Sequence, residues 1–498
     1  MKTYIDIPQY TTLNEITERN FTLSATQYKT FCIKNSNIKT VADFLERPLL
    51  RSDLGIEVGS DCYVDSSNYV FIKTKALQEE SYLLNETKDA TEYIKHQAFV
   101  SMNLKKGDII ISKDSNVGEI VILDKDYPNS MLCGGIYRLP IKKYKLYLLA
   151  FIKNDLFRQQ IDFIVPRGST IRHGKTKFLE CKIPMPKTKG NDTIRYIELL
   201  MQAIINKEIA IREKHNSIIN MIQQELTSNQ KEITYTFSQP TLNEIMELDR
   251  MDSALYTEEF KNKQFLVHNY AHGYKTIKEM GFDISRGQNL QISNIGISIQ
   301  TKEKKAGFYT LILPNFISKY GTVSQIEYLG NPNRLKTLKT GDIIFGAEGN
   351  EKGRSLVIFE TSDKTITNIH GITLNHNSDD LTKSIFVKLF LDWYRANGMI
   401  DSYAVGGNGG SMAIKYWDFL KFPRFGDKIE KEIVSLYHSE NKEYNPSQCN
   451  LDGFLNYDNT YNDKSGIHEI DTSMKQLQSK LDDAIAKIAD DIEVSCTF

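Results

Sequence analysis

Two glycine-containing stretches carry the residue types best suited to holding a phosphate or another polar ligand. The stretch RGSTIRHGKT (Arg167–Thr176) combines basic and hydroxyl side chains, and GGNGGS (Gly406–Ser411) would let a ligand approach the backbone closely. A phosphate-binding loop of the GxxxxGK[ST] type needs four residues between its glycines, whereas five separate Gly168 from Gly174. The first stretch therefore lacks the spacing of a nucleotide-binding loop. The second stretch is also compatible with a simple flexible turn.

The sequence contains no familiar catalytic or metal-binding motif. It has no [DNS]PP[YF] methyltransferase signature, no GxGxxG after a strand, no HExxH and no GxSxG, and its nine His residues lack metal-ligand spacing. The cysteines are scattered without a CxxC pair, which argues against a zinc site or a disulfide scaffold and suits a reducing cytoplasm: Cys32, Cys62, Cys133, Cys181, Cys449 and Cys496. We therefore predict no catalytic residue and no metal site.

Length and composition are those of a globular protein with more than one domain. The chain has 498 residues, of which 40% are hydrophobic and 25% charged, and no apolar run is long enough to span a membrane. Its N-terminus lacks the apolar region of a secretory signal. The net charge is -1, but the charges are unevenly distributed along the chain. Residues 104–189 contain 17 basic and 8 acidic residues, whereas residues 428–498 contain 7 basic and 14 acidic residues. A polyanionic partner is therefore compatible with the local charge, as is a solvated basic surface.

The sequence repeats itself in order. TLNEI occurs at Thr12–Ile16 and again at Thr241–Ile245, 229 positions later. Further landmarks recur at similar offsets: KKGDIIIS at 105–112 with KTGDIIFG at 339–346, Gly168-Ser169 with Gly410-Ser411, Phe178-Leu179 with Phe419-Leu420, and Pro184 with Pro423. Constant order with slowly drifting spacing indicates a duplicated domain with loop insertions.

Each half ends in a long amphipathic pattern. Between Asp192 and Leu226 the apolar stripe comprises Ile197, Met201, Ile204, Ile211, Ile218 and Ile222, which predicts a helix of about 35 residues. A second stripe comprises Met474, Leu477, Leu481, Ile485, Ile488 and Ile492, with Asp471, Thr472 and Ser473 as candidate caps. The two helices could pair as an antiparallel coiled coil, or each could pack on its own domain.

The remainder of each half predicts a mixed α/β (α+β) fold. GDIIIS with VGEIVIL, and GDIIF with SLVIFE, are typical of hairpins, and residues 147–161 and 384–400 are typical of helices. We place a first domain at 1–189, a central helix at 190–230, a second domain at 231–427 and a C-terminal helical region at 428–498. Residues 439–470, rich in Asn, Asp, Tyr and Ser, are interpreted as a loop insertion.

The ordered motifs resemble the DNA-specificity (S) subunit of Type I restriction-modification systems, or a Type IIB-like relative. The resemblance rests on GDIIIS plus VGEIVIL, RGSTIRHGKTKFLECKIPMP, and their echoes GDIIFG and GGSMAIKYWDFLKFP. It covers nearly the whole chain and implies two tandem target-recognition domains, separated and closed by long antiparallel conserved helices. The sequence departs from the family in two places that bear on partner docking. The segments that lead out of each domain, IPMPKTKGNDTIRYI and FPRFGDKIEKEIV, lack the family's usual Pro-Leu-x-Glu-Gln-like continuation. Residues 439–470 also interrupt what should be a continuous second long helix.

The resemblance also implies a function. Each domain would read one half of a bipartite double-stranded DNA site, in a prokaryotic cytoplasm. The non-catalytic chain would recruit two DNA methyltransferase subunits and restriction or translocase subunits, and S-adenosylmethionine, ATP and Mg²⁺ would be bound by these partners. The DNA contacts expected are Lys113, Asn116, Arg167, Ser169, Thr170, Arg172, His173, Lys175, Lys352, Arg354, Asn408, Ser411 and Lys415. A tandem scaffold for a protein or a glycan is the alternative, since residues 331–427 carry 12 basic against 11 acidic residues, and an enzyme with an unrecognised site comes third.

Overall fold

The computed structural model describes residues 3–24, 28–87, 89–165, 173–359, 364–378, 380–406, 409–439 and 443–498. The chain divides into two compact units. Unit 1 comprises Met1–Ile209, Glu443–Asp463 and Thr472–Phe498, and unit 2 comprises Ala210–Lys442 and Lys464–Asp471. This division follows contacts rather than sequence landmarks, so the domain boundaries inferred from the sequence stay predictions. No helix among the described residues combines the length and apolar character needed to cross a membrane.

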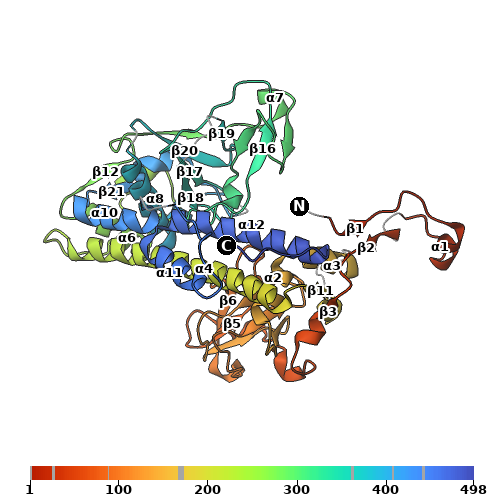
Figure 1. Ribbon diagram of the computed structural model, residues 1–498. Helices are drawn as coiled ribbons and strands as arrows, with labels where there is room; N and C mark the ends of the chain where they lie inside the picture. The colour runs from red at the N-terminus through yellow and green to blue at the C-terminus, as the bar shows by residue number, and fades with distance from the viewer. Residues whose placement is uncertain are drawn as a thin grey trace. The chain divides into compact units, whose positions relative to one another are not determined.

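Unit 1 contains short strands, two helices that pack beside them, and most of the long helical pair (Figure 1). Its elements are β1 (Ile5–Asp6), α1 (Leu13–Glu18), β2 (Thr30–Phe31), β3 (Ile38–Thr40), β4 (Tyr63–Val64), β5 (Val70–Ile72), β6 (Thr91–Ile94), β7 (Ile109–Ser112), β8 (Ile120–Ile122), β9 (Ser130–Leu132), β10 (Ile136–Leu139), α2 (Lys145–Lys153), α3 (Asp155–Ile164), β11 (Lys182–Pro184), the first part of α4 (Gly190–Ser228), α11 (Phe454–Lys464) and most of α12 (Ile467–Ala489).

Unit 2 has a similar content. Its elements are the rest of α4, then α5 (Leu242–Leu248), α6 (Glu258–His268), β12 (Tyr274–Thr276), β13 (Phe282–Arg286), α7 (Ile292–Ile295), β14 (Ile299–Thr301), β15 (Tyr309–Leu311), β16 (Glu327–Gly330), β17 (Ile343–Gly346), β18 (Ser355–Val357), β19 (Thr365–Ile366), β20 (Gly371–His376), α8 (Leu381–Ala396), α9 (Met399–Tyr403), β21 (Lys421–Pro423), α10 (Asp427–Tyr437) and the start of α12.

The strand orders of the two units are closely similar, and unit 2 has one additional strand, β13. One sheet of unit 1 has the order β10-β7-β8, and its counterpart in unit 2 has the order β13-β20-β17-β18. The other sheets have the orders β4-β6-β5-β9 and β14-β16-β15-β19, and in each the last two strands are parallel while the other pairs are antiparallel. The predicted hairpins β7/β8 and β17/β18 are confirmed. The mixed α/β fold class expected from the sequence is therefore present, and it is present twice.

The pair β3/β11 of unit 1 and the pair β12/β21 of unit 2 have the same register. Pro184 lies opposite Ile38 in the β3/β11 pair, and Pro423 lies opposite Tyr274 in the β12/β21 pair. A buried tyrosine hydroxyl reinforces both closing strands, because Tyr147 donates to the Pro184 carbonyl at 2.7 Å and Tyr394 donates to the Lys421 carbonyl at 2.6 Å. Each copy is thus closed by its own two ends.

The repeated GDI motif forms the same turn twice. Gly107 has φ +82° and Gly341 has φ +86°, a conformation that side chains with a Cβ disfavour. The aspartate that follows accepts a 2.9 Å hydrogen bond from a backbone N–H three residues earlier: Lys105 to Asp108, and Lys339 to Asp342. A second equivalent glycine pair, Gly55 and Gly287, leaves no room for a Cβ, which would lie 2.0 and 2.1 Å from a carbonyl oxygen of the neighbouring strand segment.

The helix predicted at 147–161 is two helices. The side chain of Asn154 accepts a hydrogen bond from the backbone N–H of Leu156 and caps α3, so α2 ends just before it. In unit 2 the predicted helix 384–400 is also interrupted, because Gly398 at φ +72° separates α8 from α9. The apolar pattern predicted the helical segments correctly but missed both breaks.

The long helices pair within unit 1. The buried side chains of α4 between Ile194 and Ile205 pack in one core with Leu477, Ile485 and Ile488 of α12. Lys189, beside the start of α4, pairs with Glu493, beyond the end of α12, at 2.9 Å, so the two helices run antiparallel there, as predicted. The predicted caps are wrong, because α12 already begins at Ile467 and includes Asp471, Thr472 and Ser473.

The segment 439–470 is not simply a loop, so this expectation needs correction. It contains α11 and the start of α12. Its Asn, Asp and Tyr residues suggested a loop because these types have low helix propensity. Three of its polar or aromatic side chains, Tyr444, Asp458 and Asn462, are instead buried and hydrogen-bonded to one another, which offsets that low propensity.

Candidate nucleic-acid interface

In unit 1 the turn after β7 and the segment that follows the 166–172 stretch meet at one carboxylate. Asp114 forms an isolated antiparallel bridge with His173, and its Oδ1 lies 2.8 Å from the His173 Nδ1. The Lys113 ammonium forms an ion pair with the same carboxylate. The backbone N–H of Gly174 donates to the Lys113 carbonyl at 2.7 Å. The predicted residues Lys113 and His173 are therefore brought together, with the imidazole 65% exposed.

Two further candidates flank this turn. Asn116 donates from Nδ2 to the Leu77 carbonyl at 3.2 Å, a contact that fixes the hairpin turn to the segment before it. Lys175 has φ +48° and an exposed side chain. The remaining unit 1 candidates lie outside the described residues: Arg167, Ser169, Thr170 and Arg172.

In unit 2 the equivalent turn is organised by Glu348, which stands 234 positions after Asp114. Glu348 forms an isolated antiparallel bridge with Ser411, as Asp114 does with His173. Its carboxylate lies 2.6 Å from the His370 Nδ1 and 3.3 Å from an Arg286 guanidinium nitrogen. The same position in both copies therefore holds an acidic residue whose backbone bridges to the segment that returns to the turn. Its carboxylate contacts an exposed histidine in both copies, although the two histidines come from different segments.

Of the unit 2 candidates, Ser411 and Lys415 lie at or near this surface. The backbone N–H of Ser411 donates to the Val405 carbonyl at 2.8 Å, and this bond joins the two ends of the loop that returns to the turn. The Lys415 ammonium lies 3.0 Å from Asp249 Oδ2, and the side chain is 53% exposed. Asn408 lies outside the described residues.

The structure gives Lys352 and Arg354 internal contacts. The Lys352 ammonium is buried, donates to the Gly409 carbonyl at 2.6 Å and lies 2.6 Å from Asp401 Oδ1. Arg354 donates to the Ile317 carbonyl at 3.1 Å and pairs with Glu351. These two cations therefore hold the loop in place, and direct contact with a ligand does not fit the burial of Lys352.

The sequence reasoning did not select Asp114, Glu348, His370 or Arg286. Both carboxylates stand two residues after the aligned GDI strands, so the repeat offset contained the signal for them. His370 and Arg286 meet Glu348 only through the pairing of β20 with β17 and β13, which no local pattern reveals.

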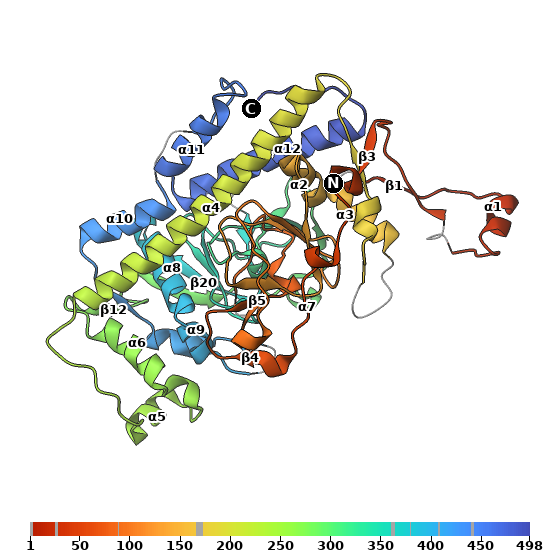
Figure 2. The same ribbon diagram turned by 90° about the horizontal axis from the view of Figure 1, so that it is seen from below.

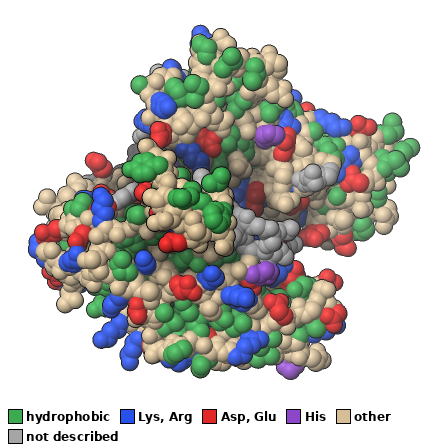
Figure 3. Space-filling view, turned by 90° about the vertical axis from the view of Figure 1, so that its right-hand side faces the viewer, with side chains coloured by type: hydrophobic (Ala, Val, Ile, Leu, Met, Phe, Trp, Pro, Cys, Tyr) green, Lys and Arg blue, Asp and Glu red, His purple; other side chains and the backbone are tan. Residues whose placement is uncertain are grey.

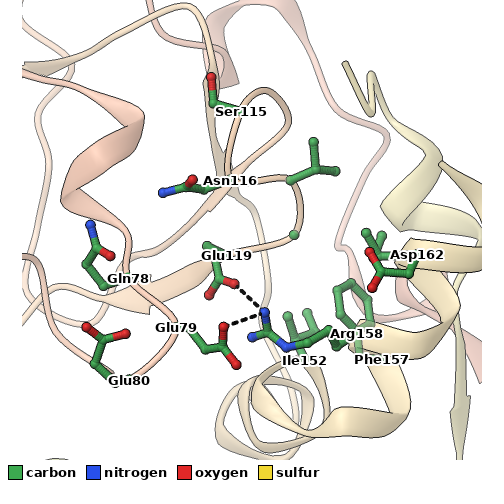
Figure 4. A pocket seen from close by; sticks show the side chains of 13 residues that line it. Gln78, Glu79, Glu80, Ser115, Asn116, Glu119, Ile152, Phe157, Arg158 and Asp162 are labelled. Carbon is green, nitrogen blue, oxygen red and sulfur yellow. Dashed lines mark ion pairs between the residues drawn. The ribbon is translucent and has the colours of Figure 1, made fainter. Parts of the chain in front are cut away.

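A cavity of about 310 Å³ lies beside the unit 1 turn (Figure 4). Four carboxylates line it, and Arg158 bridges two of them at 2.9 Å to Glu79 and 3.0 Å to Glu119. Glu80 and Asp162 complete the acidic lining. An acidic lining repels phosphate, so the cavity does not suit the backbone of a nucleic acid.

On the face drawn in Figure 3, the described side chains of the two charge signs are mixed. Small groups of hydrophobic side chains lie among them. In the part of the chain that the structure describes, no group of three or more His, Cys, Asp or Glu side chains could hold a metal ion. Binding of a polyanion would depend on the local turn regions described above.

Comparison with known proteins finds a family match for about a third of the chain. Residues 57–228 match the family model of the Type I restriction modification DNA specificity domain. No curated protein matches the chain. The resemblance inferred from the sequence motifs is confirmed for residues 57–228, which match this specificity domain, and the sheets of unit 2 resemble those of unit 1 with one strand added.

Solved structures of such subunits are similar at low identity. The S subunit of a Type I restriction-modification system from M. genitalium has 11% identity, with 91% of this chain and 95% of that chain covered and a TM-score of 0.36. The HsdS subunit from Thermoanaerobacter tengcongensis has 10% identity, with coverage of 91% and 97% and a TM-score of 0.27. A structure described as the basis of complex assembly and conformational transition of the type I R-M system has 11% identity, with coverage of 92% and 99% and a TM-score of 0.29.

Proposed function

We propose that the chain is the sequence-specific DNA-binding subunit of a restriction-modification complex, with each unit reading one half of a bipartite, asymmetric site. One observation carries the proposal: residues 57–228 match the DNA-specificity domain, and unit 2 repeats the sheet arrangement of unit 1, with the same closing register and one added strand, β13. Because the loops differ between the copies while the framework is shared, the two half-sites would differ in sequence.

The contacts would come from the turn after β7 or β17 together with the loop that returns to it. Exposed cations such as Lys175 and Lys415 would neutralise phosphates and fix the register on the duplex. Side chains beside the organising carboxylates, such as His173 and Ser411, would reach base edges in the major groove, together with Arg172 and its neighbours. Lys352 and Arg354 would act indirectly, by holding the loop that presents these groups.

The chain would have no catalytic activity of its own. It would recruit two DNA methyltransferase subunits along the long helices, with restriction or translocase subunits joining the complex. S-adenosylmethionine, ATP and Mg²⁺ would be bound by those partners. The complex would act in the cytoplasm of a prokaryotic cell, where its DNA substrate lies.

Methylation mapping tests this function. The chain is co-expressed with a candidate methyltransferase subunit from the same genome in a methylation-free host, and the host DNA is sequenced by a method that detects modified bases. A single bipartite motif with methyladenine in each half is the expected result. No modification, with a methyltransferase shown to be active by itself, would contradict the proposal and favour the protein-binding or glycan-binding scaffold.

Single substitutions then distinguish a residue that reads bases from one that contacts phosphates. Arg172→Ala should relax or abolish recognition of one half only, and Lys415→Ala should weaken binding at all sequences and reduce its salt dependence. Lys142→Ala, which removes an exposed cation outside the turn, is the matched control and should change neither property. An Arg172→Ala protein with wild-type affinity and motif would remove that residue from the contact set.

A further inference from the structure

Three ionisable side chains meet at one end of a sheet in unit 2. Arg286 is the last residue of β13, His370 directly precedes β20, and Glu348 is the second residue after β17. They come together because β20 pairs with β13 on one side and with β17 on the other. Figure 2 shows α8 beside β20, so a helix covers part of this sheet while the three residues lie at the ends of its strands.

Glu348 holds two hydrogen-bond donors at once. Its Oε2 lies 2.6 Å from His370 Nδ1, and its Oε1 lies 3.3 Å from Arg286 Nη1. Arg286 Nη1 also donates to the Ile369 carbonyl at 3.4 Å. Among the described residues these contacts engage only Nη1, so the N–H groups of Nε and Nη2 can serve another acceptor. The imidazole turns Nδ1 toward the carboxylate, so its Nε2 faces away from it.

Unit 1 gathers the same chemistry around the equivalent carboxylate. Asp114 contacts the exposed imidazole of His173 and the ammonium of Lys113, as Glu348 contacts an imidazole and the guanidinium of Arg286. The segments that supply these groups differ, since the strand β13 that carries Arg286 is the one added to the described sheets of unit 2. Each unit therefore surrounds one acid with an imidazole and a more basic side chain.

Fold stability does not account for this arrangement. Ion pairs between exposed side chains contribute only about 0–1 kcal/mol, and the Glu348 side chain is 38% exposed. On a surface that binds a polyanion, a carboxylate also repels the phosphates. This repulsion is offset when the carboxylate fixes the direction of donors that must meet one particular base.

We propose that Glu348, Arg286 and His370 form the base-reading centre of unit 2, in which Arg286 donates from Nε and Nη2 to N7 and O6 of one guanine in the major groove. Guanine presents two adjacent acceptors on that edge, which fit two parallel donors of one guanidinium. His370 presents Nε2 to the neighbouring base pair, and Glu348 is a positioning residue that holds both side chains. The inference rests on the proposed function and names a base that one half-site must contain.

DNA binding and methylation mapping with the complete complex of this chain and the methyltransferase test the guanine contact. Arg286→Ala should weaken binding to the cognate site by about 5- to 150-fold, the range that corresponds to one bidentate base contact, and should relax the motif at one G·C pair in one half only. Arg286→Gln should favour adenine at that position, because glutamine pairs with the N6 and N7 atoms of adenine. Lys304→Ala, which removes an exposed cation from the same unit, should leave the motif unchanged.

Two further measurements identify the atoms involved. Replacing the guanine by 7-deazaguanine, which lacks the N7 acceptor, should weaken wild-type binding and leave binding by the Arg286→Ala protein unchanged. Glu348→Gln should strengthen binding to non-specific DNA because one repulsion is lost, while the preference for guanine should fall several-fold because the donors are no longer held. A loss of fold stability alone would weaken both kinds of binding.

The outcomes distinguish the reading centre from the function on which it rests. A complex that methylates no bipartite motif contradicts both proposals. A wild-type motif without a G·C pair in either half overturns the reading centre alone, as does an Arg286→Ala protein with the wild-type motif and the wild-type response to 7-deazaguanine. If Arg286→Ala lowers the thermal stability of the chain, Arg286→Gln and Glu348→Gln replace it, and an unchanged preference for guanine in both would again overturn the proposal.

Discussion

A buried charge cluster in unit 1 makes a sharp stability prediction. The Lys207 ammonium of α4 lies 2.9 Å from Asp458 Oδ1 of α11, and both side chains are 0% exposed. Lys207 also donates to Asn462 at 2.8 Å, and the Tyr444 hydroxyl donates to the Asp458 carboxylate at 2.7 Å. Burial lowers the pKa of Lys207, while the Asp458 carboxylate acts in the opposite direction. The cation is therefore kept in the interior by its neighbours.

Removing one partner should cost far more than removing both. Asp458→Asn leaves the Lys207 cation buried without an anion, and such a change costs about 3–5 kcal/mol. Lys207→Met/Asp458→Leu replaces the pair by apolar side chains, so its unfolding free energy should lie within about 2 kcal/mol of the wild type. The remaining cost comes from the Tyr444 hydroxyl, which loses its acceptor, and from the buried Asn462 amide, which loses both Lys207 and Asp458 as partners.

Native-state hydrogen exchange of the α11 amides measures these differences locally, which matters because a chain with two units need not unfold in one step. The double-mutant cycle should give a coupling of about 2 kcal/mol or more between the two residues. An Asp458→Asn protein destabilised by less than about 1 kcal/mol, or a double variant as unstable as the single one, would refute the reasoning.

Other predictions concern the frame of each unit. Tyr147→Phe and Tyr394→Phe should each lower the free energy of unfolding by about 1–2 kcal/mol, because a carbonyl of the closing strand loses its hydrogen-bond donor. The loss should be larger at Tyr394, because its hydroxyl oxygen also accepts a hydrogen bond from that strand. Urea unfolding measures both changes. Gly287→Ala should destabilise unit 2 by about 3 kcal/mol because its Cβ meets a carbonyl, whereas Gly426→Ala, at an open position, should be neutral. Burial, and then a nearby lysine, lower the pKa of His268 from 6.5 to about 4, so the folded state keeps it neutral. Stability should therefore fall as pH drops from 6.5 to 4, and His268→Asn should flatten that fall in acid unfolding curves.

The sequence predicted the features of the fold that depend on short-range patterns. The hairpin after each GDI turn follows from strand alternation bounded by glycine, and the long α4 stripe follows from helical periodicity that extends over many turns. The parallel pairs β5/β9 and β15/β19 were not predicted, because they join segments that are more than fifty residues apart. No local pattern encodes such a pairing.

The candidate site was predictable only in part, for a related reason. The repeat offset located the turns that carry Lys113 and Ser411, since landmarks of the two halves align there. Whether a cation in such a turn faces outward depends on what packs over it. Lys352 is covered by the Gly409 and Asp401 segments, whereas Lys415 is half exposed, and sequence composition does not distinguish these two cases.

The closing strand pairs have a consequence for how this protein can change. Because β3 pairs with β11, and β12 pairs with β21, the segment between the two strands of each pair begins and ends at nearly the same place. A segment with adjacent ends can be replaced by another of the same kind without redirecting the flanking helices. Recombination between related genes at one of these strand pairs would therefore exchange the whole segment between β3 and β11, or between β12 and β21, and keep the helices. A new combination of the two segments could then arise in a single step rather than by stepwise mutation.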